Sequence, residues 1–258
     1  MSDYITALEK LTPKDDLPKT VEEEKQLLQA LKSVEQASLD RVSSSGIFAG
    51  LTRRLLEEGA INVVDSRKVG IRSGFTNFLH LRQGRGRDGL NLLSVNWSRH
   101  FIHSCLKAAG VPVQKESIYA NELDGIENDS VSLGHISPGN DAEMLIMSSS
   151  DKLEYMNRLR KQHSGSIIDS STESEVPIVY IGDSWTDIEC LLHADLGVCI
   201  RDEPLGSSQK KLAKRLESLG VCCPHLSAWD EADERQVVWA RDFAEIESWI
   251  EIQQARKN

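Results

Sequence analysis

The segment IVYIGDSWTDIECLLHADLGVCI, residues 178–200, constrains the fold of this chain more than any other segment. Four apolar residues lead directly into Gly182, Asp183 and Ser184, a short helical pattern follows, and a second apolar run begins at Leu196. Short apolar runs that do not alternate with polar residues, and that are joined through a helix, are typical of parallel strands covered on both faces. Such sheets bind ligands beyond the carboxyl ends of their strands, which is where Asp183 stands.

The same alternation of strand and helix patterns extends over the chain from about residue 70 onward. Strands are expected at 90–95, 117–121, 178–182 and 196–200, and helices at 73–83, 98–110, 150–163, 187–195 and 207–220. Repeated strand–helix units of this kind predict an α/β fold built on a parallel sheet.

The region before residue 70 has a different pattern, which is helical throughout. Thr20 with Glu23 three residues later forms the signature of a capping box, and apolar residues then recur at close to the helical period. A second helix is expected to follow and to stop at Gly59. The sequence therefore predicts a helical cap region, residues 1–69, and an α/β core, residues 70–258.

Charge and composition exclude several classes of partner. The net charge is −10 and the pI is about 5.2, whereas nucleic acid or an anionic membrane calls for a basic face. No apolar run approaches the roughly 20 residues that span a bilayer, and the start MSDYITALEK has no secretory pattern. The five cysteines form no C-x-x-C pair, which indicates reduced thiols and argues against zinc. We expect a cytoplasmic protein.

Asp183 and Asp187 are the first candidate site residues. One follows the end of a strand and the other lies one turn into the next helix, so both carboxylates can reach one ligand. Hard oxygen ligands of this kind suit Mg²⁺, which typically takes one or two carboxylates together with waters and a phosphate. The alternative is that Asp183 and Ser184 only cap the helix.

Ser94 and Lys152 are candidates for binding phosphate. Ser94 ends the strand LNLLS, and the backbone N–H groups of Val95 and Asn96 precede a helix that begins near Ser98. Lys152 opens another helix, although the helix dipole favours cations at the other end, so a phosphate beside it explains its place. The alternatives are a capping serine and a solvated surface lysine.

The segment GRGRDG, residues 84–89, matches the glycine pattern of dinucleotide-binding loops. Such a loop must follow a strand and open a helix, whereas this one follows a helix and opens a strand. We therefore interpret it as an ordinary loop.

Taken together, Ser94 at one strand end, Lys152 opening a helix and GDSxxD at another strand end resemble the second, third and fourth motifs of the haloacid dehalogenase superfamily. The resemblance covers about residues 70–200. It implies a Rossmann-type parallel sheet with a helical cap, phosphomonoester hydrolysis, and Mg²⁺ held by Asp183 and Asp187. Ser94 and Lys152 are implied to bind the phosphate of a small phosphorylated metabolite.

The block VNWSRHFI with IYANEL resembles, more specifically, a fungal and plant branch of small phosphatase-like proteins. Some members of that branch are fused to a domain similar to thiaminase II and act on thiamine monophosphate. The helical region before residue 70 corresponds to the helical cap of that branch.

The nucleophile motif of the superfamily, D-x-D-x-T/V after an apolar strand, is missing. Its first Asp attacks phosphorus, and its second is the general acid and base. Asp15 and Asp16 are adjacent and follow no strand. Asp65 follows the apolar run INVV, expected as a short strand, but Arg67 takes the place of the second Asp. Asp65 is therefore a weak candidate for the nucleophile.

Residues 1–258 are expected to lack the central first strand of this fold, and two histories account for its absence. Either the protein is longer and supplies the strand upstream of Met1, as a Mg²⁺-dependent phosphatase, or the chain is a non-catalytic descendant that binds a phosphorylated ligand or a protein partner.

Overall fold

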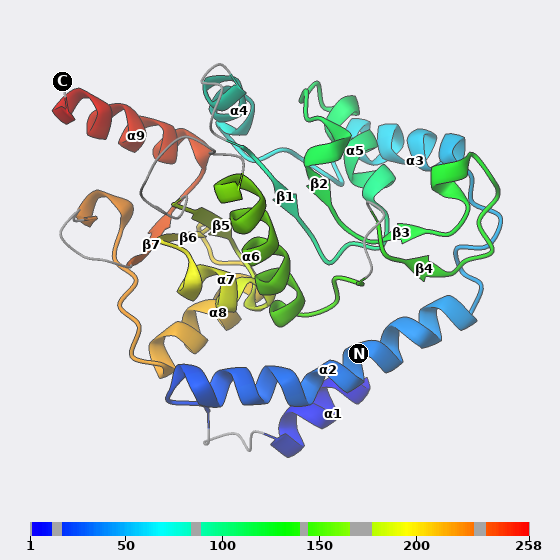
Figure 1. Ribbon diagram of the computed structural model, residues 1–258, viewed down its shortest axis with the longest axis horizontal. Coiled ribbons are helices and arrows are strands. Elements are labelled where there is room, and N and C mark those ends of the chain that lie inside the picture. The colour runs from blue at the N-terminus through cyan, green and yellow to red at the C-terminus, as the bar shows by residue number, and fades with distance from the viewer. Residues whose placement is uncertain are drawn as a thin grey trace. The chain divides into compact units, whose positions relative to one another are not determined.

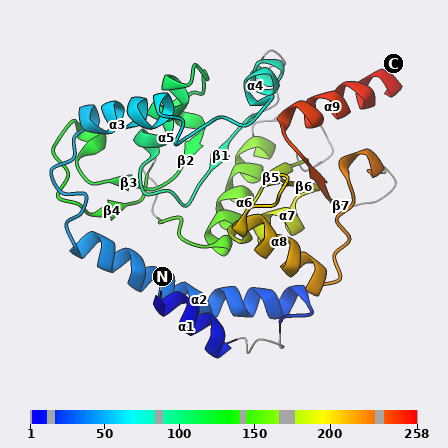
Figure 2. The same cartoon turned by 180° about the vertical axis from the view of Figure 1, so that it is seen from behind.

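The computed structural model describes residues 2–11, 17–83, 89–139, 144–165, 177–229 and 236–257 (Figures 1 and 2). Asp15, Asp16 and all but the last residue of the GRGRDG loop lie outside the described residues. Contacts divide the chain into two units, residues 1–32 with 148–258 and residues 33–147. The predicted cap region and the predicted core each contribute residues to both units.

A three-stranded sheet lies at the centre of the first unit. Strands β5 (Val179–Gly182), β6 (Leu196–Ile200) and β7 (Gln236–Ala240) are parallel and pair in the order β5-β6-β7. Every residue of β6 is buried, so both of its faces are covered, as its apolar run predicts. The strands expected at 178–182 and 196–200 are confirmed, whereas β7 was not predicted.

Helices surround this sheet in the first unit. They are α1 (Ser2–Leu11), the first part of α2 (Val21–Ser44), α6 (Ser149–Gly165), α7 (Ile188–His193), α8 (Ser207–Ser218) and α9 (Phe243–Lys257), with short 3₁₀ helices η3 (Trp185–Asp187) and η4 (Leu226–Ala228). Helix α7 lies directly on β6, because a Cβ atom at Gly197 would stand 2.4 Å from the carbonyl oxygen of Leu191. The close approach requires glycine at that position.

Helix α2 is fixed at its start by the predicted capping box. The Thr20 hydroxyl accepts from the Glu23 N–H at 3.2 Å, and the Glu23 carboxylate accepts from the Thr20 N–H at 3.2 Å. Leu27, Leu28 and Leu31 then enter the apolar core with residues of α7 and α8. The prediction of an amphipathic helix here is confirmed.

A buried acidic residue also attaches α2 to this unit. Glu24 is fully enclosed, its carboxylate accepts the indole N–H of Trp185, and its other oxygen lies 3.7 Å from the Arg215 guanidinium. The Trp185 ring also lies beneath two cations, with the Lys211 amine 3.8 Å and the Arg215 guanidinium carbon 4.8 Å from its centroid. The Arg215 guanidinium and the hydrogen-bonded indole make the buried charge of Glu24 tolerable.

The second unit combines helices with two small sheets. Helix α3 (Arg53–Asp65) packs on α5 (Arg99–Ala108), and α4 (Phe75–Gln83) precedes the sheets. Strands β1 (Leu92–Leu93) and β2 (Ile118–Tyr119) are parallel, and β3 (Glu122–Leu123) and β4 (Ile136–Ser137) are antiparallel. Two 3₁₀ helices, η1 (Lys115–Ser117) and η2 (Ile126–Asn128), lie between them. The protein is thus a mixed α/β chain.

Three predictions about the region before residue 70 are wrong: the continuous helical pattern, the helix end at Gly59 and the strand at INVV. Residues 45–50 form turns, and the helix that follows runs through Gly59 to Asp65. The segment INVV is therefore the last part of α3 and not a strand. Its apolar residues were mistaken for a strand because a run of four cannot by itself distinguish a strand from a buried helical turn.

No helix of the described chain is long and apolar enough to cross a membrane.

Replacing Gly59 by alanine tests its place in the middle of α3. A Cβ atom there would meet Phe101 at 3.9 Å, an ordinary contact, and glycine is entropically costly in a helix. We expect Gly59→Ala to raise the free energy of unfolding by about 0.5–1 kcal/mol in urea denaturation. Gly134→Ala is the matched control and should destabilise, because Gly134 has φ +98° and a Cβ there would lie 3.0 Å from the Ala49 nitrogen. A loss of stability in Gly59→Ala contradicts the helix.

Candidate functional site

The loop that follows β5 folds back on itself around Asp187. Asp187 ends η3, and its side chain lies against the backbone of Gly182. A Cβ atom at Gly182 would stand 2.6 Å from the Cβ of Asp187, which no side chain tolerates. The glycine of the GDSxxD segment is therefore required by the position of its second aspartate.

The Asp187 carboxylate accepts hydrogen bonds on both oxygens. Oδ1 accepts from the Lys152 amine at 2.6 Å and from the Tyr180 hydroxyl at 2.8 Å. Oδ2 accepts from the Ser184 hydroxyl at 2.8 Å and from the backbone N–H groups of Ser184 at 3.0 Å and Asp183 at 3.2 Å. This buried carboxylate holds the start of the loop, strand β5 and helix α6 together.

Lys152 is a buried residue and not a solvated surface lysine, with 6% of its surface exposed. It lies in the first turn of α6, where its amine bonds to Asp187. The preceding residue, Asp151, is also buried and accepts from the backbone N–H and hydroxyl of Ser148 and from Lys32 at 2.7 Å. The unusual lysine at a helix N-terminus is thus explained by a carboxylate partner.

Protonation in this network follows from burial and charge. Burial raises the pKa of Asp187, but the charge and hydrogen bonds of Lys152, Tyr180 and Ser184 outweigh it, so the net pKa is lowered. Burial and the neighbouring Asp187 charge raise the pKa of Tyr180 well above its ordinary value. Asp187 is therefore an anion and Tyr180 a neutral donor at neutral pH.

Asp183 stands directly after β5, and its side chain is half-buried. It is better placed than Asp187 to contact a metal, because both Asp187 oxygens already accept from several donors and a cation would compete with the Lys152 ammonium. Within the described ranges, no group of three or more His, Cys, Asp or Glu side chains is placed to hold a metal ion. Of the two predicted ligands, Asp183 at the strand end is the one that would hold Mg²⁺, because ligation by Asp187 would compete with the Lys152 ammonium.

Ser94 lies in the second unit, immediately after β1. Its N–H donates to the Tyr119 carbonyl at 2.9 Å, and its hydroxyl oxygen accepts from the Asn96 N–H at 3.1 Å. The hydroxyl proton of Ser94 can still be donated, but the Asn96 N–H expected to bind phosphate is engaged by Ser94 itself. Val95, between them, is exposed.

The helix that follows, α5, has its N-terminal N–H groups satisfied within the protein. Ser98 caps it by accepting from the Phe101 N–H at 3.0 Å, as a capping residue does. The His100 N–H donates at 2.7 Å to Glu122, a buried carboxylate that also accepts from the Ser98 hydroxyl at 2.7 Å. Burial raises the pKa of Glu122, against these hydrogen bonds. The N–H groups at the start of α5 itself therefore bind groups of the protein, whereas the phosphate site predicted at Ser94, Val95 and Asn96 stays a prediction.

The block of sequence around Asn121 has a related structural role. Its side-chain amide donates to the Ile146 carbonyl at 2.9 Å and accepts from the Ile146 N–H at 2.8 Å. Its own backbone N–H donates to the Asn96 carbonyl, and its carbonyl accepts from the Arg99 N–H. The residues quoted for the family resemblance therefore organise the second unit around α5.

Asp65, the weak nucleophile candidate, is the last residue of α3 and is exposed. It follows a helix and not a strand, so it lacks the strand-end position that the nucleophile motif requires. In the first unit, the structure brings Lys152 and Asp187 together with the Asp183 backbone, whereas Ser94, Val95 and Asn96 belong to the other unit.

Comparisons with known proteins found two distant relatives. The chain is 29% identical over 180 residues to a CTO1 family protein of Schizosaccharomyces pombe, which covers 68% of this chain and 60% of that protein. It is 29% identical over 187 residues to the mitochondrial bifunctional TH2 protein of Arabidopsis thaliana, covering 67% of this chain and 25% of that protein. The matches thus span only part of each relative's length. No family model matches the chain.

Replacing Asp187 by asparagine tests the buried ion pair. Asp187→Asn leaves the Lys152 ammonium buried without its counter-charge, and we expect a loss of about 3–5 kcal/mol in the free energy of unfolding at pH 7. Asp65→Asn, at an exposed helix end, is the control and should change stability by less than about 0.5 kcal/mol. Equal stabilities of the two variants contradict the role given to the pair.

The difference in stability between the parent and Asp187→Asn should also depend on pH. Because the folded-state pKa of Asp187 is lowered, its ionised form stabilises the fold fully above the unfolded value, about 3.9, and this contribution is lost as the pH falls through the folded pKa. The stability difference between the parent and Asp187→Asn should therefore be constant near neutral pH and shrink below about pH 4.

Proposed function

We propose that this chain carries the metal- and phosphate-binding residues of a Mg²⁺-dependent phosphomonoester hydrolase of haloacid dehalogenase type, with a Rossmann-like core and a helical cap region. The observation that carries the proposal is the buried Lys152–Asp187 pair beside Asp183, at the carboxyl end of a parallel strand. Ligands of open parallel sheets bind at that end. The relationship to the bifunctional TH2 protein and the CTO1 family protein supports a phosphatase-like ancestry.

Each residue of the proposed site has a distinct task. Asp183 is the metal ligand, and the bound Mg²⁺ supplies charge neutralisation for a phosphate. Asp187 holds the loop so that the Asp183 carboxylate stays at the strand end, through the Asp183 N–H and the Ser184 N–H. Lys152 balances the charge of Asp187 and adds positive potential near the same strand end. Ser94 lies in the other unit, and the superfamily resemblance implies that its hydroxyl donates to a phosphoryl oxygen.

The nucleophile has to be supplied from outside these residues, because the 258 residues contain no D-x-D sequence. Strand β5 is suited to take an additional neighbour: it pairs with β6 on one edge, no described strand pairs with the other, and Val179 is 56% exposed. A strand ending in D-x-D beside β5 would place a carboxylate at the same sheet edge as Asp183.

A non-catalytic protein that binds a phosphorylated ligand or a protein partner is the second candidate. One observation favours it: the only Asp that follows an apolar run ahead of Ser94, Asp65, is exposed at the end of a helix. In that case the Lys152–Asp187 pair is retained for stability, and the chain binds phosphate without hydrolysing it.

Hydrolysis of p-nitrophenyl phosphate in the presence of Mg²⁺ distinguishes these candidates. We expect residues 1–258 to show no turnover above background, because their sequence contains no D-x-D motif to supply the nucleophile. Adding an upstream segment with a strand that ends in D-x-D-x-T should give Mg²⁺-dependent turnover and a higher melting temperature, since it also covers the edge of β5. Turnover by residues 1–258 that is abolished in Asp65→Asn would instead make Asp65 the nucleophile.

Calorimetric titration with Mg²⁺ tests the metal site directly. We expect weak binding of Mg²⁺, because a single carboxylate does little to offset the cost of removing water from the hydrated ion. Asp183→Asn should abolish the binding heat, and Asp65→Asn should leave it unchanged. If Asp183→Asn binds Mg²⁺ as well as the parent does, the GDSxxD loop serves only as a helix cap.

A further inference from the structure

We propose that Ser227, His225 and Glu245 form a second reactive site, in which the serine is a nucleophile that cleaves carboxylic esters. The Ser227 hydroxyl lies 2.8 Å from His225 Nδ1, and His225 Nε2 lies 2.8 Å from a carboxylate oxygen of Glu245. A hydroxyl, an imidazole and a carboxylate in this order activate serine nucleophiles on unrelated folds. This proposal does not depend on the phosphatase function.

The hydrogen bonds around His225 determine which of its nitrogens carries the proton. The backbone N–H of Ser227 donates to Nδ1 at 3.3 Å, so Nδ1 holds the lone pair and the proton lies on Nε2. The Ser227 hydroxyl therefore donates to Nδ1, and Nε2–H donates to Glu245. In this tautomer the imidazole can accept the serine proton, which is the task of a general base.

Glu245 is held in place as an anion at the start of α9. Its second oxygen accepts from the Arg241 N–H at 2.6 Å, and its own N–H donates to the Asp242 carboxylate at 3.0 Å. Burial raises the pKa of Glu245, but the hydrogen bonds from Arg241 and His225 outweigh it, so the net pKa is lowered. A charged Glu245 keeps the proton on Nε2 and stabilises the imidazolium that forms when His225 takes a second proton.

The segment that carries His225 runs beside the sheet of the first unit. His225 pairs with Trp239 of β7 in a parallel bridge, and the Trp239 N–H donates to the Pro224 carbonyl at 2.8 Å. Ser227 follows this segment, at the carboxyl ends of the parallel strands, where ligands of such sheets bind. The Trp239 ring meets the His225 ring edge-on, with 4.5 Å between the centroids, and this contact orients the imidazole.

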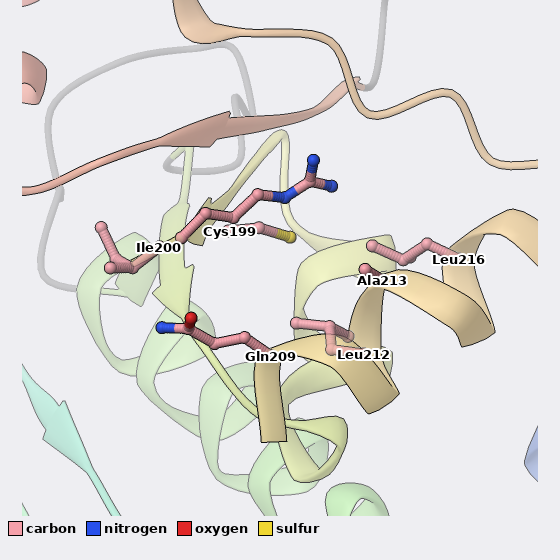
Figure 3. A pocket seen from close by; sticks show the side chains of 7 residues that line it. Cys199, Ile200, Gln209, Leu212, Ala213 and Leu216 are labelled. Atoms are coloured by element: carbon pink, nitrogen blue, oxygen red, sulfur yellow. The ribbon is translucent and has the colours of Figure 1, made fainter. Parts of the chain in front are cut away.

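The three side chains are open to reagents. Ser227 is exposed, and the side chains of His225 and Glu245 keep 33% and 25% of their surface exposed. Arg201 packs on the same Trp239 ring, with its guanidinium carbon 5.5 Å from the centroid, and it lines the crevice between β6 and α8 that Figure 3 shows. Arg201 thus brings positive charge to this end of the sheet, and positive charge suits the oxyanion that develops when an ester is cleaved.

Ester cleavage at this site takes two balanced steps. The Ser227 oxygen attacks the carbonyl carbon while its proton passes to His225 Nδ1, and the bond to the alcohol oxygen breaks as that oxygen takes the proton. Water then attacks the acyl-serine and gives one proton to His225, which returns it to Ser227 as the acid leaves. The sum is ester and water giving acid and alcohol, with no change of oxidation state.

The alternative role of His225 is structural, because Nδ1 also caps η4 by accepting the Ser227 N–H. His225→Asn separates the two roles. Asparagine is a good capping residue and can accept the same N–H, but its amide cannot take a proton from the serine. A capping role alone predicts that this variant keeps the reactivity of Ser227, whereas a general base predicts that the reactivity is lost.

Labelling with a fluorophosphonate probe, followed by peptide mass spectrometry, tests the nucleophile. We expect Ser227 to form the phosphonyl adduct as fluoride leaves, Ser227→Ala to form none there, and His225→Asn to react about 100-fold more slowly or less. Ser248→Ala is the matched control and should label like the parent, because the Ser248 hydroxyl is exposed and donates only to a backbone carbonyl. An unlabelled Ser227 in the parent, or equal rates in the parent and His225→Asn, would overturn the proposal.

Two further measurements test the orienting carboxylate and the ester reaction. The imidazole ¹⁵N chemical shifts of His225 should report the Nε2–H tautomer in the parent and a mixture of tautomers in Glu245→Gln, with slower labelling of Ser227. Hydrolysis of p-nitrophenyl acetate in a Cys222→Ser background, which lacks the exposed thiol, should need no Mg²⁺ and should fall to background in Ser227→Ala. Unchanged hydrolysis in Ser227→Ala would contradict an ester-cleaving site. Circular dichroism confirms that each variant is folded.

Discussion

The loop after β5 depends on one buried carboxylate, that of Asp187. It is the common acceptor for Lys152, Tyr180 and the Ser184 hydroxyl, and for the N–H groups of Asp183 and Ser184. Five donors converging on one carboxylate repay the cost of burying its charge, and they fix the strand, the loop and α6 to one another. The backbone of Asp183, whose N–H is one of these donors, is thereby fixed at the strand end.

Much of the fold could be predicted from periodicity and capping signals, because these are local. The β5–α7–β6 unit and the start of α2 at Thr20 were predicted correctly, since their burial and hydrogen bonds arise within a few residues. Strand β7, QVVWA, was missed because its apolar run is only four residues long, and a run of that length does not by itself identify a strand. The end of α3 was misplaced because a glycine ends a helix only where the chain after it leaves the helical path. At Gly59 the packing of α3 on α5 keeps the chain helical as far as Asp65.

The sequence predicted which residues belong to the candidate site, but it predicted their structural roles less well. Spacing identified Lys152, Asp183 and Asp187, but the meeting of Lys152 with Asp187 brings together α6 and η3, and no local pattern reports such a contact. The same applies to Glu24, an acid in the first turn of α2 whose carboxylate accepts from the Trp185 indole. Glu122 was missed at the N-terminus of α5 because it lies 22 residues from the His100 N–H that it accepts from. In each case the sequence shows which side chain is present, and tertiary contacts determine its hydrogen-bond partner.

The saturation of Asp187 has a consequence for how the two candidate functions are distinguished. A lysine–aspartate pair buried this deeply is strongly destabilising to break, so a descendant that has lost its chemistry would still retain it. The pair therefore supports the ancestry of the site equally well for an enzyme and for a binding protein. Asp183 differs, because its half-buried carboxylate is not the acceptor on which the loop is built. Substitution of Asp187 therefore tests the stability of the loop, whereas substitution of Asp183 tests the proposed metal site.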